Sequence, residues 1–241
     1  MSVLQYRRDI DGLRAIAVTL VIFFHYQFPF FSGGFIGVDV FFVISGFLIT
    51  GLLLKVQSSD DFSFSTFYSR RIRRLLPSFL LVSLVTFIVI SRYYMDDDYY
   101  IFSKSWLGSV IGLSNIYFHG ELSQYFSADA KIRSLLHTWS LAVEEQFYVV
   151  WPALVMLVCI GVGTQTMRNV RLRVGVTAAI AAVTSFVACM ALMNSSQPWA
   201  FFSPHTRAFE LAIGALVAVV PIGASITLVR VNALLAWCGL A

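Results

Sequence analysis

Six long apolar runs constrain the fold of this chain more than any other feature. A helix needs about 20 mostly apolar residues to cross a lipid bilayer. The runs cover residues 15–31, 35–54, 75–92, 137–160, 174–193 and 206–226. Charged residues make up only 12% of the chain, too few to cover the surface of a soluble globule. The sequence therefore predicts an all-α, polytopic transmembrane helical bundle, and it excludes a soluble domain, a disordered tail and a nucleic-acid-binding module.

Two further segments leave the number of spans at six or seven. Residues 102–118 are weakly hydrophobic, rich in Ser and Gly, and include Lys104 and Asn115. We expect this segment to be re-entrant or interfacial rather than to cross. Residues 231–241 begin another helix that is too short to span a bilayer. The chain is therefore expected to be one membrane domain, 1–241, truncated within a further span.

The positive charges predict the orientation of the spans, because Lys and Arg gather in cytoplasmic loops. Arg7, Arg8 and Arg14 precede the first run, and the segment 55–74 after the second run is strongly basic. The segment 27–34 has no charge, and residues 93–101 include three consecutive aspartates. The N-terminus and 55–74 are therefore expected inside, and 27–34 and 93–101 outside.

The first run contains a single ionisable side chain, His25. Arg14 lies eleven residues earlier, about three helical turns, so the two side chains share one face about 16 Å apart along the axis. Asp11 lies near the same face. Ionisable groups at membrane depth usually mark function, and an imidazole suits general base chemistry. The alternative is a structural histidine bonded to a backbone carbonyl.

The second run combines small residues with one acid. Gly33, Gly34, Gly37 and Ser45-Gly46 favour close packing of helices. Asp39 is predicted to be a buried acid that either orients His25 or binds a substrate hydroxyl. A hydrogen bond between helices explains it equally well.

Four arginines stand just before the third apolar run. Their guanidinium groups suit a phosphorylated cytosolic ligand, because each can form paired hydrogen bonds to phosphate. The alternative is that they fix topology and bind lipid headgroups. The four are Arg70, Arg71, Arg73 and Arg74.

The run 137–160 begins with a polar face. Helical spacing places His137, Ser140, Glu144, Tyr148 and Trp151 within about 60° of one another. Such a face is expected to line a cavity or to pack against other spans. Tryptophans can also be interfacial anchors, but that role does not explain Glu144.

The remaining polar groups point to no clear site. Arg207 and Glu210 lie one turn apart, and an intrahelical ion pair is the simplest interpretation. No partner is assigned to His119 or His205. The cysteines show neither zinc-binding nor disulfide spacing, so no metal site is expected.

Several motifs in this order resemble the acyltransferase-3 family of membrane acyltransferases. The resemblance covers about residues 5–216. Its hallmark, an Arg and a His separated by ten residues, is matched by Arg14 and His25. The other matching segments are Tyr6 to Val18, Gly34 to Thr50, Phe67 to Pro77, Trp139 to Glu144, and Arg207 with Glu210.

The resemblance implies a domain of about ten spans that transfers an acyl group, acetyl above all, from cytosolic acyl-CoA to a hydroxyl of a cell-envelope glycan such as lipopolysaccharide O-antigen. The first two motifs are most similar to those of bacterial members with a C-terminal SGNH-type domain, which this chain lacks. The protein is then expected in the bacterial cytoplasmic (inner) membrane with its N-terminus in the cytoplasm, and without a bound cofactor.

Family and chemistry together assign roles to the candidate residues. His25 would be the general base or the acyl carrier, and Glu144 and Asp39 would orient it or the acceptor. Arg14, Arg70, Arg71 and Arg74 would bind the acyl-CoA. Supporting roles fall to Asp11, Ser140, Tyr148, Arg207 and Glu210. Two alternatives stay open: a carrier that moves the acyl donor or the glycan without chemistry, and a non-catalytic subunit of an envelope-glycan complex.

Overall fold

The computed structural model of the chain describes residues 7–57, 64–93, 96–122, 133–160 and 167–220. Within helices, the side chains of residues 56, 57, 64, 67, 70, 74, 96 and 97 lie outside the described part. All regular structure in these ranges is α-helical, which confirms the predicted class. The helices are α1 (Arg8–His25), α2 (Ile36–Gln57), α3 (Phe64–Tyr93), α4 (Asp96–Val110), α5 (Ser114–Glu121), α7 (Thr138–Cys159), α8 (Met167–Met193), α9 (Gln197–Phe202) and α10 (Pro204–Val219).

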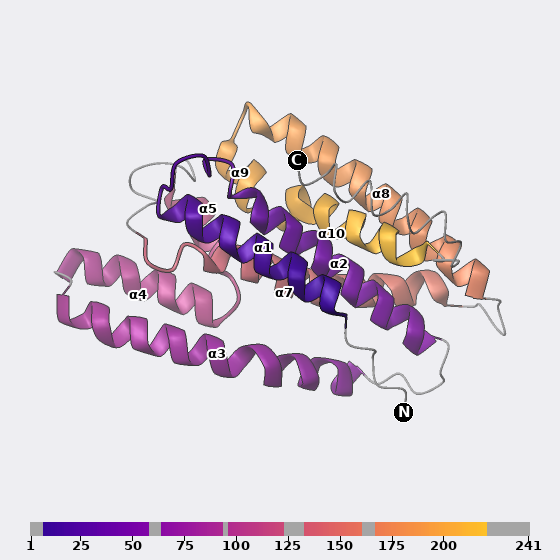
Figure 1. Ribbon diagram of the computed structural model, residues 1–241, viewed down its shortest axis with the longest axis horizontal. Coiled ribbons are helices and arrows are strands. Elements are labelled where there is room, and N and C mark those ends of the chain that lie inside the picture. The colour runs from indigo at the N-terminus through magenta and orange to yellow at the C-terminus, as the bar shows by residue number, and fades with distance from the viewer. Residues whose placement is uncertain (1–6, 58–63, 94–95, 123–132, 161–166, 221–241) are drawn as a thin grey trace.

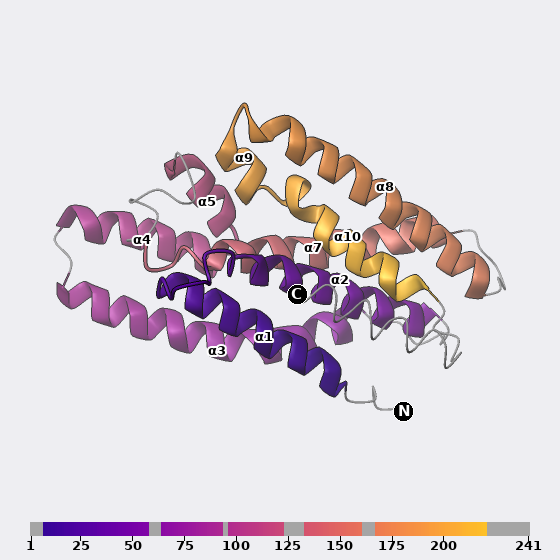
Figure 2. The same ribbon diagram turned by 45° about the horizontal axis from the view of Figure 1, so that its top comes forward.

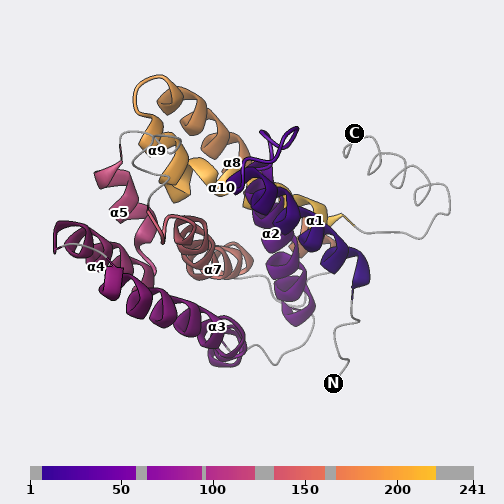
Figure 3. The same cartoon turned by 60° about the vertical axis from the view of Figure 1, so that its left-hand side comes forward.

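The long helices run roughly side by side along one axis of the molecule (Figures 1 and 2). α2 packs against α1, α7 and α10, and α10 also packs against α8. α3 and α4 form a hairpin on one side of α7, and α8 and α9 lie on the other side (Figure 3). The result is a bundle in which α7 and α2 are central and α3 is peripheral.

Four helices are long and apolar enough to cross a membrane in the part of the chain that the structure describes, and they lie in α2, α3, α7 and α8. α1 falls short because Arg8, Asp9, Asp11 and Arg14 occupy its first two turns. α10 is described over only 16 residues, and the rest of the predicted run, 221–226, lies outside the described residues, as does 231–241. A count of six or seven spans therefore stays a prediction.

The outward faces of α3 and α8 are apolar and exposed. In α3 the exposed side chains include Leu81 and Ile88, and in α8 they include Ile180 and Val183, each more than half exposed. Soluble monomers rarely expose apolar surface of this extent. Lipid contact explains it, because a hydrocarbon environment imposes no cost on these faces.

α1 ends at His25, earlier than the apolar run 15–31 predicts, so that boundary is wrong. Gln27 and Phe30 adopt positive φ angles of 55° and 72°, which no α-helix accommodates. The Phe28 N–H instead donates to the Phe23 carbonyl, and the chain turns towards α2. Apolar composition alone did not reveal this turn.

The segment 102–118 is divided between two helices that turn back on each other. α4 ends at Val110, Gly112 adopts a φ of +72°, and α5 starts at Ser114. The end of α3 and the start of α7 lie at the same end of the bundle in Figures 1 and 2. α4 and α5 therefore form a helical hairpin that packs against α7, and whether residues 102–118 are re-entrant in the membrane stays a prediction.

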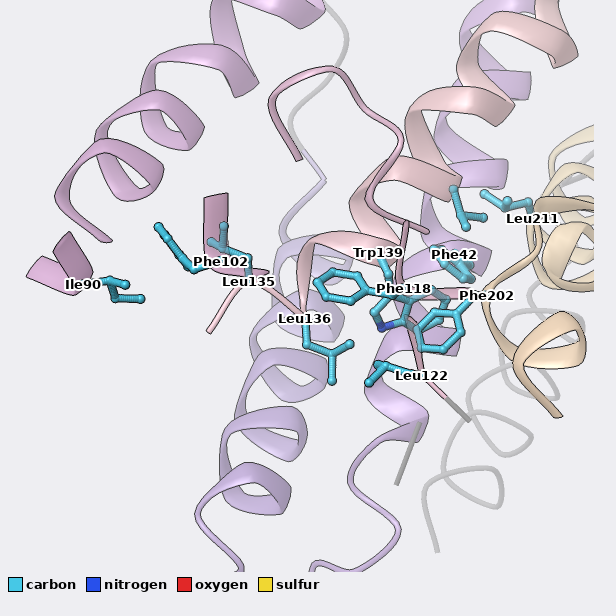
Figure 4. Packing of buried hydrophobic residues seen from close by; sticks show 11 residues of the cluster. Phe42, Ile90, Phe102, Phe118, Leu122, Leu135, Leu136, Trp139, Phe202 and Leu211 are labelled. Carbon is cyan, nitrogen blue, oxygen red and sulfur yellow. The ribbon is translucent and has the colours of Figure 1, made fainter. Parts of the chain in front are cut away.

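Aromatic side chains from five helices form the core near the turn of this hairpin (Figure 4). The Trp139 ring lies 5.6 Å from Phe202 and 6.1 Å from Phe42, measured between centroids. Phe118 of α5 lies 6.4 Å from Phe202. With Phe102 of α4, these aromatic side chains come from α2, α4, α5, α7 and α9, and Leu211 of α10 packs against them.

The bundle has two chemically different ends. One end, here called the basic end, holds the start of α1, the end of α2 and the starts of α3 and α8, with Arg8, Lys55, Arg71 and Arg168 (Figures 1 and 2). The other, here called the opposite end, holds the end of α1, the starts of α2, α7 and α10, and the short helices α5 and α9.

Candidate functional site

Close contact between α2 and α10 positions the polar residues on both helices. A Cβ atom added to Gly46 would collide with the Leu211 carbonyl, and one added to Gly214 would collide with the Val43 carbonyl. Gly34 and Gly37 similarly admit the backbone of α1. The predicted role of Gly34, Gly37 and Gly46 in close packing is confirmed, whereas Gly33 has no atom within 4 Å of a built Cβ.

Ser45, beside this contact, binds Glu144 of α7. The Ser45 hydroxyl donates a hydrogen bond to Glu144 Oε1. The hydroxyl of Tyr148 also hydrogen-bonds this pair, and both Ser45 and Tyr148 are buried. Glu144 therefore lies inside the bundle with two hydroxyl partners, on the polar face that the sequence predicts.

Two arginines act electrostatically on the Glu144 carboxyl, Arg71 from α3 and Arg14 from α1. The Arg71 guanidinium lies over the Tyr148 ring, 3.2 Å from its centroid. Arg14 also pairs with Asp11 at 3.9 Å. The structure thus brings together Arg14, Ser45, Arg71, Glu144 and Tyr148 from four helices.

A cavity of about 330 Å³ adjoins Arg71 between α3 and α7. It extends along α7 from Tyr148 to Thr138, a distance of about 15 Å at 1.5 Å per residue. Its wall is mostly apolar, with Arg71, Glu145 and Tyr148 towards the basic end. The volume is at the lower limit for small-molecule pockets.

The tip of the α4–α5 hairpin closes this cavity away from the basic end. Ser109 and Gly112 line it, and the Ser109 and Thr138 hydroxyls lie 2.8 Å apart. The side chain of Gln146 donates to the Gly112 carbonyl at 3.1 Å, which satisfies a backbone group freed by the helix break. Backbone irregularity at this depth is therefore compensated by α7.

Asn115 and Gln146 fix the hairpin in place, and sequence analysis missed this role. Gln146 Nε2 donates to Asn115 Oδ1 at 2.9 Å, and Asn115 Nδ2 donates to the Phe202 carbonyl at 3.2 Å. Both amides stand out in apolar segments, but nothing in the sequence pairs two residues 31 positions apart.

His25 is exposed at the opposite end, as the last residue of α1. Its Nδ1 lies 2.8 Å from the Val21 carbonyl. Because a carbonyl can only accept, Nδ1 carries the hydrogen, so in the neutral imidazole the lone pair is on Nε2. The backbone contact therefore fixes the tautomer and remains compatible with a base or a nucleophile at Nε2. His25 also lies within electrostatic range of His137.

Asp39 binds Arg207 of α10, which is the helix-to-helix interaction that the sequence left open. Arg207 also pairs with Glu210 at 3.0 Å, as expected from their spacing. The rings of Phe42, Trp139 and Phe201 surround the guanidinium, with the Phe201 centroid nearest at 5.3 Å. This cluster joins α2 to α10 at the opposite end.

Other predicted site residues have no described contact with the Glu144 cluster, which is Arg14, Ser45, Arg71, Glu144 and Tyr148. Ser140 donates to the His137 carbonyl at 3.1 Å. Arg70 and Arg74 lie on α3, but their side chains are outside the described residues. Of Arg71 and Arg73, whose side chains the structure describes, Arg71 acts on the Glu144 carboxyl and Arg73 is exposed.

Comparison with known proteins identifies the family. Residues 7–238 match the acyltransferase-3 family, whose matching unit is described as an acyltransferase domain. The chain is 36% identical over 225 residues to the "putative peptidoglycan O-acetyltransferase YrhL" of Bacillus subtilis, covering 90% of this chain and 33% of that protein. It is 33% identical over 218 residues to the "peptidoglycan O-acetyltransferase OatA" of Listeria monocytogenes, covering 90% of this chain and 34% of that protein.

The chain thus spans about a third of the length of these curated relatives. No solved structure matches it significantly. The family match covers nearly the whole chain, includes the Arg14 and His25 motif, and agrees with an all-helical fold that contains apolar spans. On these grounds, the chain belongs to the acyltransferase-3 family of membrane acyltransferases.

Proposed function

We propose that the protein transfers an acetyl group from cytosolic acetyl-CoA to a hydroxyl of a cell-wall glycan, peptidoglycan above all. The names of the relatives favour peptidoglycan as the acceptor, whereas the family resemblance of the sequence motifs had suggested lipopolysaccharide. The observation that carries the proposal is the convergence of Arg14, Ser45, Arg71, Glu144 and Tyr148 beside a cavity inside an apolar bundle.

The basic end would face the cytoplasm of a bacterial cell, since Lys and Arg mark that side of the membrane. The acyl-CoA would enter there, with Arg71 and Arg14 binding its phosphates and Arg70 and Arg74 extending the site. The cavity along α7 would receive the pantetheine arm with its acyl group. The glycan would approach the opposite end, where His25 lies.

His25 Nε2 would activate the acceptor as a general base. It would take the proton of the glycan hydroxyl while that oxygen attacks the thioester carbonyl, the C–S bond breaks, and coenzyme A leaves as a thiolate that is then protonated. Nucleophilic attack by Nε2 to form an acyl-imidazole, followed by transfer to the glycan, satisfies the same geometry. Glu144 would orient the donor through Arg71, and Asp39 would hold the acceptor side through Arg207.

Transfer of labelled acetyl from acetyl-CoA to peptidoglycan in membranes tests this proposal. The protein and its His25→Ala variant would be compared. Tyr26→Ala is the matched control, because Tyr26 is the exposed neighbour of His25. Loss of transfer in His25→Ala, with normal transfer in Tyr26→Ala, is the expected result. Equal transfer in both variants would refute a role for His25, and donor uptake without acetylated product would favour a carrier.

A further inference from the structure

Trp199, an exposed tryptophan at the opposite end, is flanked by two imidazole rings. The His119 ring of α5 packs edge-on against Trp199 of α9, with centroids 4.1 Å apart. The His205 ring of α10 lies 6.0 Å from the same indole. The three residues come from helices that meet at this end in Figures 1 and 2. Trp199 remains 46% exposed.

Hydrogen bonds from α5 and α10 hold the backbone of α9, the short helix that carries Trp199. The hydroxyl of Thr206, which is fully buried, lies 2.8 Å from the Ser203 carbonyl and 3.1 Å from the Trp199 carbonyl, which share its hydrogen. Asn115 donates to the carbonyl of Phe202 in the same short helix at 3.2 Å. α9 is thus tied to both α5 and α10, and the packing of His119 and His205 against the indole restricts its rotation, which lowers the conformational entropy lost on binding.

A membrane-interface anchor is the simplest role for an exposed tryptophan, but it does not explain the imidazoles. Burial lowers the pKa of His119 and so favours its neutral ring, which offers one nitrogen as a donor and the other as an acceptor. Sugar rings present a C–H face that stacks on indole and a rim of hydroxyls that both donate and accept. Trp199 with its two imidazoles matches that combination.

We propose that Trp199, flanked by His119 and His205, is a sugar-binding subsite that holds one pyranose ring of the glycan acceptor. The indole stacks on the sugar face, and the imidazole nitrogens bind hydroxyls at its edge. This inference rests on the proposed function, since it assigns a place to the acceptor of that reaction. It adds residues that lie outside the Arg14 and His25 motif.

Steady-state kinetics of the full-length protein in membranes tests the subsite, with soluble peptidoglycan oligosaccharides as the acceptor. Trp199→Ala should raise the acceptor KM about tenfold, equivalent to about 1.4 kcal/mol, and leave the acetyl-CoA KM unchanged. Trp199→Phe should recover most of the loss. His119→Ala should raise the acceptor KM, and His119→Gln, which keeps a donor and an acceptor, should restore it. Phe30→Ala is the matched control, because Phe30 is fully exposed in the loop after α1.

An unchanged acceptor KM in Trp199→Ala would overturn the subsite, including the case in which only the amount of membrane-inserted protein falls. A second measurement separates this failure from failure of the proposed function. Quenching of tryptophan fluorescence by the same oligosaccharides should be lost in Trp199→Phe and kept in Phe30→Ala. That result would support the subsite even if acetyl-CoA proved not to be the donor, and quenching equal in both variants would count against it.

Discussion

The Ser45 hydroxyl donates its hydrogen bond to Glu144 Oε1 and thereby links α2 to α7 across 99 positions of the chain. Ser45 is buried, so its hydroxyl replaces water as the partner of the carboxyl. Tyr148 supplies a second hydroxyl, and Arg71 lies on the Tyr148 ring. The position of Arg71 thus depends on a hydrogen bond between two other helices.

Ser45→Ala should weaken both folding and transfer. The substitution leaves a carboxyl oxygen without its donor, which costs about 1–3 kcal/mol in a buried site. We expect a lower free energy of unfolding in mixed micelles and at least a tenfold lower rate of acetyl transfer. Ser83→Ala is the control, because Ser83 is equally buried but bonds only to the Leu80 carbonyl of its own helix. Equal effects of the two substitutions would show that the Glu144 contact has no special role.

Arg71→Ala should raise the acetyl-CoA KM more than tenfold, because it removes the guanidinium that faces both Glu144 and the cavity. Arg71→Lys should recover only part of the affinity, since an ammonium cannot form paired hydrogen bonds to phosphate or stack on Tyr148. Initial rates at varied acetyl-CoA concentrations measure both. Arg73→Ala, at an exposed position two residues away on α3, should leave this KM within about twofold. A larger effect of Arg73→Ala than of Arg71→Ala would contradict the placement.

Arg207→Ala should destabilise the bundle because it leaves Asp39 and Glu210 without their shared cation. Removing one partner of a mostly buried ion pair costs about 2 kcal/mol or more. Denaturant titration of the purified protein measures the loss, and a double-mutant cycle with Asp39→Asn isolates the α2–α10 pair. Arg7 and Asp9 provide the comparison, since both are about half exposed and their coupling should stay below about 1 kcal/mol. Similar coupling in the two pairs would exclude a stabilising role for the Arg207 cluster.

Gly46→Ala should force α2 and α10 apart, because the new methyl group would collide with the Leu211 carbonyl. Overpacking of this kind costs about 1–3 kcal/mol, more than the helix propensity gained. Gly51→Ala on the same helix meets nothing within 4 Å and should be neutral or slightly stabilising. Thermal unfolding of the two variants compares them directly. A stable Gly46→Ala protein would mean that the two backbones do not touch.

The helical class, four membrane-length helices of the described part of the chain and the inward positions of Glu144 and Tyr148 follow from composition and periodicity. Glu144 and Tyr148 were predictable because a polar group in an apolar helix must face the interior, and their spacing fixes a common direction. The residues of other helices that bind Glu144 and Tyr148 could not be predicted from the sequence. Ser45 reads in sequence as a small packing residue, and its bond to Glu144 arises only from the way α2 crosses α7.

Helix ends were predicted less well than helices. The turn after His25 lies in a segment with three phenylalanines, so hydropathy extends the run to residue 31 despite Gln27 and Pro29. The short helix α9 carries no periodic signal over its six residues. The contact of Trp199 with His119 and His205 could not be predicted, because the three residues lie on three different helices.

The hairpin formed by α4 and α5 has a topological consequence. α4 and α5 together add no passage of the chain from one end of the bundle to the other (Figure 2). The chain that sets out from the basic end at Arg8 consequently comes back to that end at Val219. Had residues 96–121 crossed instead, α7, α8 and α10 would be inverted, and the arginines of α8 would lie on the side of the membrane away from those of α3.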